Sequence, residues 1–303
     1  MHHVGRLDWS FSDSPAPASA TAVGLSRQVL VGPSHGAVHT ELAAGSLKPG
    51  GWLGRHVHSF EEALYVLAGE LILEIGGAVH RLVAGDYAHM AIGVRHTLAN
   101  AGSEEVRWLS VNSPQRQAPD SGRRDTFFDR VPVDPAALAE RSVRPPFGDP
   151  TLRSVGHYEG TPPQQEALRV ADPARGRRPA GMDTALLAYS GISVKMLVDR
   201  TFGADLVTMF TVDYEPGGAA QAHDHPFEET YLFLAGEVHA ELDGVPYTFR
   251  PGDVAFAGVG SVHGFWNEGT ERVRWIETQA PQPPARHAYR WVDSWKRLET
   301  EGG

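Results

Sequence analysis

Histidines and glutamates recur in this sequence in two groups of identical spacing. Each group holds a His-X-His triplet, a glutamate four residues after the second histidine, and a third histidine further along the chain. The members of the first group are His56, His58, Glu62 and His96, and those of the second are His223, His225, Glu229 and His263. Each member of the second group follows its counterpart by 167 residues (223 − 56 = 225 − 58 = 229 − 62 = 263 − 96 = 167). A single His-X-His is common, but two complete sets in register indicate metal sites.

The residue types predict which metals these groups would bind. Side chains alternate along a β-strand, so both histidines of a His-X-His triplet point to one face. A tight turn would return the chain so that the glutamate faces the same way, and the later histidine would complete the set. Three imidazoles and one carboxylate suit Fe(II) or Mn(II), which we favour, and also Ni(II), Co(II) or Zn(II). An octahedral ion would keep two positions open, and open positions allow catalysis.

The repeat extends beyond the candidate ligands. At the same offset, Pro49-Gly50-Gly51 matches Pro216-Gly217-Gly218, Gly85-Asp86 matches Gly252-Asp253, and Val106-Arg107-Trp108 matches Val273-Arg274-Trp275. No insertion separates the copies between about 49 and 114. This internal duplication predicts two similar domains.

Short β-branched and aromatic runs separated by glycine turns fill both copies, as in Leu71–Ile75, Gly76-Gly77 and Ala78–Val83. They indicate an all-β fold, either an antiparallel barrel or a sandwich. We place the first domain in residues 1–120 and the second in 186–303, with repeat cores at about 45–114 and 212–281. Residues 121–185 form a Pro/Arg-rich connector, with a lid as one hypothetical role. It contains a short helix with Asp134 as N-cap and Pro135 as its first residue.

Composition excludes several classes of protein. The 303 residues include no cysteine, which excludes thiolate zinc sites, disulfides and cysteine nucleophiles. A net charge of −10 without basic clusters argues against nucleic-acid binding. No run approaches the roughly 20 apolar residues that span a bilayer, and no secretory signal is evident. We therefore expect a cytoplasmic protein that binds a small-molecule substrate and no membrane, and leave a homo-oligomer open.

With these motifs in place, the chain resembles the cupin superfamily, and specifically its bicupins. The first cupin motif is met from Gly50 to Gly69 and from Gly217 to Gly236, with three residues between the second histidine and the glutamate. The second motif is met from Gly85 to Asn100 and from Gly252 to Asn267, except that Ala91 and Gly258 replace its proline. The resemblance implies two tandem cupin barrels of the double-stranded β-helix (jelly-roll) type, commonly exchanging N-terminal strands, each with a metal at its centre. It does not name the reaction, because one fold hosts many activities.

Residues beside the candidate ligands differ between the copies. By alternation from Glu229, Tyr231 and Phe233 join the inner face of the second barrel, and Phe265 replaces Leu98 of the first. We therefore expect the second site to bind an aromatic or carbonyl substrate, with simple filling of the barrel as the alternative.

Two further residues are candidates for a substrate pocket in the first copy. Trp52 and Arg55 precede the His-X-His triplet, and Arg55 could clamp a carboxylate. The candidates for a general acid or base are Gln221, Asp224, Tyr231 and Glu277, of which Tyr231 has the best predicted direction.

The leading hypothesis is a metal-dependent bicupin oxidoreductase of dioxygenase type that acts on a small aromatic or oxygenated organic substrate. Quercetinase-type bicupins resemble this pattern, although they commonly place four residues between histidine and glutamate. A second hypothesis is a non-redox hydrolase, decarboxylase or isomerase, similar to ureidoglycine aminohydrolase or oxalate decarboxylase. A third is a non-catalytic bicupin that binds a metal or a ligand, although storage members often lose the ligands that this chain keeps.

Overall fold

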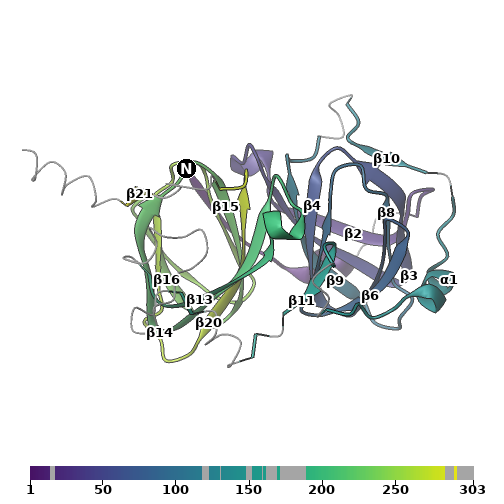
Figure 1. The fold of residues 1–303 in the computed structure, drawn as a ribbon. Coiled ribbons are helices and arrows are strands. Elements are labelled where there is room, and N and C mark those ends of the chain that lie inside the picture. Colours follow the sequence, from purple (N-terminus) through teal and green to yellow (C-terminus); the bar gives the residue numbers. More distant parts are fainter. Residues whose placement is uncertain are drawn as a thin grey trace, which may run out of the picture.

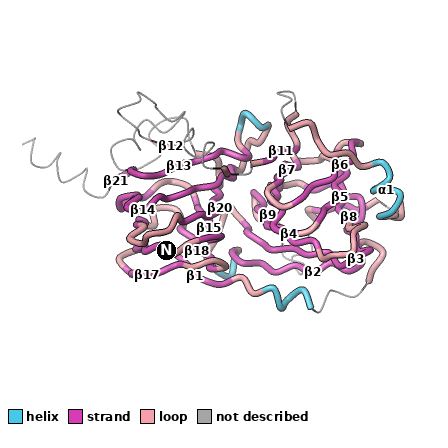
Figure 2. Tube along the Cα trace, turned by 90° about the horizontal axis from the view of Figure 1, so that it is seen from below, coloured by secondary structure: helices cyan, strands magenta, loops and turns pink. Residues whose placement is uncertain are grey.

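The computed structural model describes residues 1–13, 18–117, 123–129, 131–147, 152–158, 160–161, 169–170, 189–283 and 290–291. Two curled antiparallel sheets lie side by side, the first in blue and the second in green to yellow (Figure 1). Strands dominate both halves, and helices are short (Figure 2). This architecture confirms the prediction of an all-β fold with two jelly-roll barrels.

The first sheet is built mainly from the first copy of the repeat. Its strands are β2 (Ala22–Val31), β3 (Glu41–His58), β4 (Glu61–Ala68), β5 (Glu70–Ile75), β6 (Ala78–Val83), β7 (Asp86–Met90), β8 (His96–Ala99), β9 (Val106–Ser113), β10 (Thr126–Phe128) and β11 (Val155–His157). Gly76 and Gly77 have φ values of 58° and 93° and join β5 to β6. Positive φ at both central residues matches the right-handed twist of a hairpin, which explains the pair of glycines.

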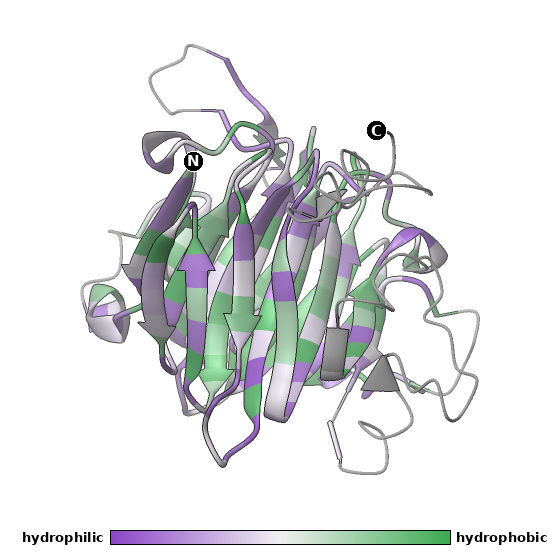
Figure 3. Cartoon of the chain, turned by 90° about the vertical axis from the view of Figure 1, so that its left-hand side faces the viewer, coloured by the Kyte–Doolittle hydropathy of each residue, from purple (hydrophilic) through white to green (hydrophobic). Residues whose placement is uncertain are grey.

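The second sheet repeats this order. Its strands are β1 (His2–Arg6), β12 (Arg169–Val170), β13 (Tyr189–Val198), β14 (Thr208–Asp224), β15 (Glu228–Ala235), β16 (Val238–Leu242), β17 (Val245–Phe249), β18 (Asp253–Ala257), β19 (His263–Trp266), β20 (Val273–Ala280) and β21 (Arg290–Trp291). Polar and apolar bands alternate along these strands, as expected when one face of a sheet is buried (Figure 3).

The barrels exchange strands. β1, at the start of the chain, pairs with β18 of the second barrel, so that Val4 lies opposite Ala255. β11, from the predicted connector, pairs with β7 of the first barrel, so that Val155 lies opposite Ala88. Because β7 and β18 are counterparts in the repeat, each barrel receives an equivalent strand from the segment that precedes the other barrel.

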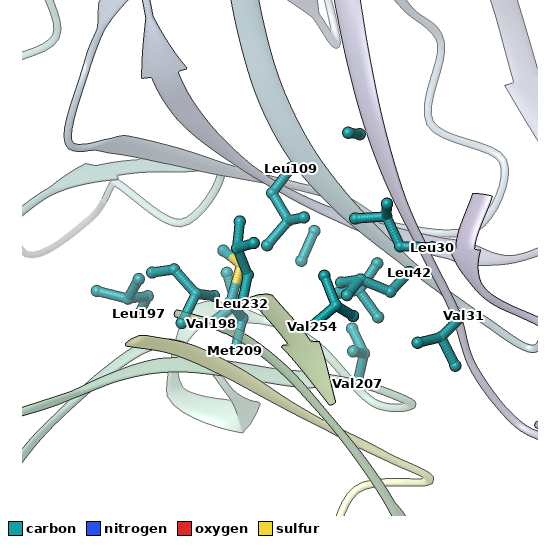
Figure 4. Close-up of a cluster of buried hydrophobic side chains, with 14 of the residues drawn as sticks. Leu30, Val31, Leu42, Leu109, Leu197, Val198, Val207, Met209, Leu232 and Val254 are labelled. Atoms are coloured by element: carbon teal, nitrogen blue, oxygen red, sulfur yellow. The ribbon is translucent and has the colours of Figure 1, made fainter. Parts of the chain in front are cut away.

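A shared apolar core holds the barrels together. Leu30, Leu42 and Leu109 of the first barrel contact a layer formed by Met209, Leu232 and Val254 of the second (Figure 4). These side chains are at most 6% exposed. Complete burial of one such side chain contributes about 1.5–3 kcal/mol, so this interface fixes how the two barrels sit relative to each other.

Besides β11, the connector adds a helix and the strand β10 to the first barrel. Helix α1 (Pro135–Arg141) begins as predicted, because the Asp134 side chain accepts hydrogen bonds from the backbone N–H groups of Ala136 and Ala137. β10 pairs with the end of β3, where Thr126 lies opposite His58. Within the described residues, no helix is long and apolar enough to cross a membrane.

Candidate metal centres

Three strands bring together the candidate ligands of the first barrel. His56 and His58 lie at the end of β3, Glu62 at the start of β4 and His96 at the start of β8. His56 and His96 are opposite each other in the β3–β8 ladder, and their ring centroids are 4.1 Å apart. β14, β15 and β19 repeat this arrangement with His223, His225, Glu229 and His263.

In each barrel the candidate ligand nitrogens of the three histidines lie within 4.8 Å of one another, and all three residues are buried. The sequence thus predicted correctly that residues up to 40 positions apart converge.

Hydrogen bonds fix the orientation of all six rings. In each histidine Nδ1 lies 2.6–2.9 Å from a backbone carbonyl oxygen. The accepting residues are Gly54, Phe60 and Val94 in the first barrel and Gln221, Phe227 and Ser261 in the second. A carbonyl can only accept, so Nδ1 carries the proton and Nε2 presents its lone pair, the arrangement that metal-binding histidines require.

The histidine Nε2 atoms point into the centre of each cluster. Among the described residues, Nε2 of His58, His96 and His263 is buried without a hydrogen-bond partner. A buried polar atom without a partner is costly, whereas a bound cation would satisfy these lone pairs. The donor set of both clusters therefore fits a divalent metal.

The candidate glutamates lie next to the histidines. Oε2 of Glu62 is 3.6 Å from Nε2 of His58 and 4.0 Å from Nε2 of His96. Oε2 of Glu229 is closer to its histidines, at 2.9 Å from His225 and 3.1 Å from His263. Both carboxylates are placed to complete a set of four ligands.

The electrostatic environment favours neutral imidazoles beside ionised carboxylates. Burial and the neighbouring His96 lower the pKa of His56 to about 3, and burial and His263 do the same to the pKa of His223, also to about 3. Burial opposes ionisation of Glu62, but the nearby histidines, His58 first among them, lower its pKa to about 2. These protonation states are those that metal binding requires.

A cavity of about 310 Å³ lies beside the first cluster. Its wall includes His56, His58 and Glu62 together with Leu53, Leu98, Trp108, Ser110 and Phe128. The volume lies at the lower end of the roughly 300–1,000 Å³ typical of small-molecule sites. β10 of the connector forms part of the wall, since the Phe128 ring lies 5.0 Å from the His56 ring.

Two arginines also line this cavity. Arg27 of β2 forms an ion pair with Glu41 at 2.5 Å. The guanidinium group of Arg116 lies 5.7 Å from the centre of the Phe60 ring, which stacks on His58 at 4.0 Å. Burial and the nearby charge of Arg27 lower the pKa of Arg116. The first cavity therefore combines a candidate metal with positive charge.

The second cluster faces a much smaller cavity, of about 30 Å³. Tyr231, Phe265 and Trp275 line it, and Phe233 lies in the same apolar cluster. This volume holds about two water molecules at most. Of the two cavities that described residues form beside the histidine clusters, the larger lies in the first barrel, whereas the aromatic residues predict a substrate at the second.

A buried polar network surrounds the candidate glutamate of the second barrel. Gln279 donates a hydrogen bond of 2.6 Å to Oε1 of Glu229, and the Tyr231 hydroxyl donates to Oε2. Trp275 donates a hydrogen bond of 2.9 Å to Glu277. Burial and the carboxylate of Glu229 raise the pKa of Glu277 well above its usual value. Tyr231 thus lies beside the second cluster, as predicted, and its hydroxyl contacts the candidate ligand Glu229.

The structure places two predicted pocket residues outside the metal-facing cavity. Trp52 packs against an apolar cluster that includes Ile72 and Leu138, the latter from helix α1. Arg55 forms an ion pair of 2.8 Å with Glu74 and donates to the backbone oxygen of Pro132. Neither side chain lies on the wall of the 310 Å³ cavity. Arg55 lines a separate cavity of about 260 Å³, together with His96.

Arg27 and Arg116 are the residues that sequence reasoning missed. At the repeat offset, Arg27 corresponds to Val194, so alignment of the strands outside the motif cores would have shown a charge in only one copy. Arg116 lies just beyond the last matched positions near residue 114, and no repeat signal marks it.

Comparison with known proteins agrees with the fold. The Cupin domain family matches residues 45–112 and 210–278. The chain belongs to the cupin family and carries two cupin domains, which makes it a bicupin. It is 30% identical over 123 residues to "Polyketide synthase CurC" of Streptomyces cyaneus, a match that covers 39% of this chain and 80% of that protein. It is also 29% identical over 111 residues to "Protein SchB" of Streptomyces halstedii, a match that covers 36% of this chain and 80% of that protein.

Solved structures show the same two-barrel fold. Salicylate 1,2-dioxygenase from Pseudoaminobacter salicylatoxidans, in a structure with gentisate, has a TM-score of 0.66 at 15% identity, covering 92% of this chain and 81% of that chain. The "Putative Glyoxylate Induced Protein" from Pseudomonas aeruginosa has a TM-score of 0.59 at 17% identity, covering 90% of this chain and 85% of that chain. At these identities the likeness establishes the fold alone.

Proposed function

We propose that this bicupin is a metal-dependent oxygenase of dioxygenase type, and that its substrate is a small aromatic compound bearing a carboxylate. The observation that carries the proposal is the 310 Å³ cavity, which joins the cluster of His56, His58 and Glu62 to Arg27 and Arg116. We assign His56, His58, His96 and Glu62 as the ligands of the working metal. The equivalent four residues of the second barrel would hold a second metal.

Each part of the cavity has a role in this proposal. A bound Fe(II) or Mn(II) would supply the Lewis acidity and one-electron chemistry that O2 activation requires. Arg116 and Arg27 would hold the substrate carboxylate through charge-assisted hydrogen bonds. Leu53, Leu98 and Trp108 would contact an aromatic ring and exclude water, which strengthens the electrostatic interactions inside the cavity.

The comparisons support this proposal without deciding the substrate. Salicylate 1,2-dioxygenase shares the two-barrel fold, and the name of that enzyme and its complex with gentisate refer to aromatic carboxylates. CurC carries the name of a polyketide synthase, and aromatic polyketides are oxygenated rings of the same general chemistry. Tyr231, Phe233 and Phe265 would shape the second centre, where the cavity leaves no space for a ring.

Oxygen consumption tests this function. The protein would be loaded anaerobically with Fe(II) and mixed with salicylate, gentisate or benzoate in aerated buffer, with benzamide as an uncharged control of similar size. We expect O2 uptake with at least one carboxylate and none with benzamide, because the arginines require an anion. Conversion of a substrate without O2 would contradict the proposal and favour a non-redox bicupin.

A further inference from the structure

A pair of glutamates links the two barrels beside the candidate metal centres. Glu61 precedes the candidate ligand Glu62, and Glu228 precedes Glu229. The Glu61 carboxylate accepts hydrogen bonds from the backbone N–H groups of residues 205, 206 and 207 in the second barrel, at 2.8, 2.8 and 3.3 Å. The Glu228 carboxylate accepts from residues 38, 39 and 40 in the first barrel, at 2.7, 2.9 and 3.0 Å. We call these two glutamates the cross-barrel clamps.

The clamps are deeply buried and symmetric. Glu61 is 3% exposed and Glu228 is 2% exposed. A buried carboxylate is tolerated only where hydrogen bonds compensate for lost water, and three backbone donors serve each clamp. Loosening of a clamp would leave a buried carboxylate without its hydrogen-bond donors, which is costly. Each glutamate and the backbone segment that it binds are therefore expected to move together.

Glu61, the clamp of the first barrel, is connected by hydrogen bonds and chain continuity to the candidate metal centre of the second barrel. Residues 205–207 run directly into β14, whose first residue is Thr208. The Thr208 hydroxyl donates a hydrogen bond of 3.1 Å to Gln279, and Gln279 donates one of 2.6 Å to Glu229. A continuous series of contacts therefore joins Glu62, through its neighbour Glu61, to the candidate glutamate ligand of the other barrel.

Glu228, the clamp of the second barrel, is connected in the same way to the candidate metal centre of the first barrel. Residues 38–40 run into β3, whose first residue is Glu41. Glu41 accepts hydrogen bonds from Arg27 at 2.5 Å and from Asn112 at 3.2 Å. Arg27 lines the first cavity, and Asn112 lies opposite Glu62 in the β4–β9 ladder. The two series of contacts together form a closed ring through both centres.

We propose that Glu61 and Glu228 are positioning residues that couple the two metal centres, so that a metal in either barrel strengthens metal binding in the other. The inference rests on metal binding in both barrels, as proposed above. A metal bound by Glu229 restrains the Glu228-Glu229 segment, and through the clamp it restrains residues 38–41 and the strand partners of Glu62. By linkage, a metal in the first barrel has the same effect on the second.

A thermodynamic cycle with Co(II) tests the coupling in the full-length chain. Co(II) binding is measured by calorimetry and by the visible spectrum of the bound ion. The variant His225→Ala gives the association constant of the first centre, and His58→Ala gives that of the second. The unaltered protein gives the overall association constant for two ions. The coupling factor is the overall constant divided by the product of the two single-site constants. We expect a factor of about 5 or more, the usual lower range for coupled sites.

Clamp variants assign the coupling to these residues. In backgrounds carrying Glu61→Gln or Glu228→Gln, the same cycle is expected to give a factor close to one, because an amide cannot accept from all three backbone donors. Glu237→Gln, at an exposed glutamate of the second barrel paired with Arg250, is the matched control and should leave the factor unchanged.

Three results would contradict the proposal in distinguishable ways. A factor of one in the unaltered protein would exclude coupling. A factor that persists in both clamp variants would exclude the clamps as its route. Failure of the unaltered protein to bind Co(II) at all would overturn the metal sites themselves, and with them the proposed function. Should either clamp variant fail to fold, the cycle in the unaltered protein, which leaves the clamps intact, still decides whether the centres are coupled.

Discussion

Replacing His58 with alanine is expected to reduce turnover by more than about 100-fold, since even the outer hydrogen-bond partners of metal ligands are typically worth 10–100-fold. His58 belongs to the first cluster and also lines the 310 Å³ cavity. Its removal deletes one of three imidazoles and leaves Glu62 without its nearest histidine, at 3.6 Å. The measurement is the steady-state rate of O2 uptake at saturating Fe(II).

His225→Ala is the matched control, because His225 is the counterpart of His58 in the second barrel and makes the equivalent hydrogen bond to a backbone carbonyl. At saturating metal this variant should keep most of the turnover, since the cavity of about 30 Å³ beside the second cluster is too small for an aromatic ring. The account would be wrong about the working barrel if His225→Ala lost activity and His58→Ala did not. Turnover that is undiminished in both variants would exclude a metal-catalysed reaction.

Replacing Arg116 with alanine is expected to raise the KM for a carboxylate substrate by about 10- to 100-fold, in line with the roughly 1.5–3 kcal/mol of a hydrogen bond to a charged group. The guanidinium group lies over the Phe60 ring and lines the cavity. Its contribution is made equally to the bound substrate and to the transition state, so kcat should change little. Arg116→Lys should recover part of the loss, because it restores the charge but not the paired donors.

Arg250→Ala provides the control for this prediction. Arg250 is an exposed arginine of the second barrel that pairs with Glu237 at 2.7 Å, so its loss removes one positive charge far from the cavity. We expect no change in KM. If the KM in Arg116→Ala stayed within about twofold of the unaltered value, the substrate would not be recognised as an anion at this position.

The sequence predicted the fold and the histidine clusters because the repeat supplied them twice. The offset of 167 residues identified which histidines belong together, and strand alternation placed each His-X-His triplet on one face. The helix at Pro135 was equally readable, because N-capping is a local interaction.

Strand alternation does not hold along β3, because this strand is irregular. Counting back from His56 in steps of two places Trp52 on the metal-facing side, but the β3–β8 ladder shifts register between Leu53 and His56. This bulge reverses the alternation, so that Leu53 lines the cavity and Trp52 packs toward helix α1. A single extra residue in one strand leaves no clear mark in the sequence.

The sequence also could not show how full each barrel is. Tyr231, Phe233 and Phe265 face inward as alternation predicted, but whether aromatic rings surround a ligand or fill the space depends on the sum of all side-chain volumes. In the second barrel the rings stack on one another, as Phe233 does on Phe249 at 4.6 Å, and they fill the space. In the first barrel Leu98 and Ser110 stand where the second has Phe265 and Glu277, and the smaller side chains leave the cavity.

Elemental analysis of metal per chain tests the central claim, that each barrel binds a divalent metal through three histidines and a glutamate. The protein would be purified anaerobically, reloaded with Fe(II) or Mn(II), and freed of loosely bound ions. We expect about two equivalents in the unaltered protein and about one in each of His58→Ala and His225→Ala. No retained metal in the unaltered protein, or the same content in all three proteins, would contradict the account.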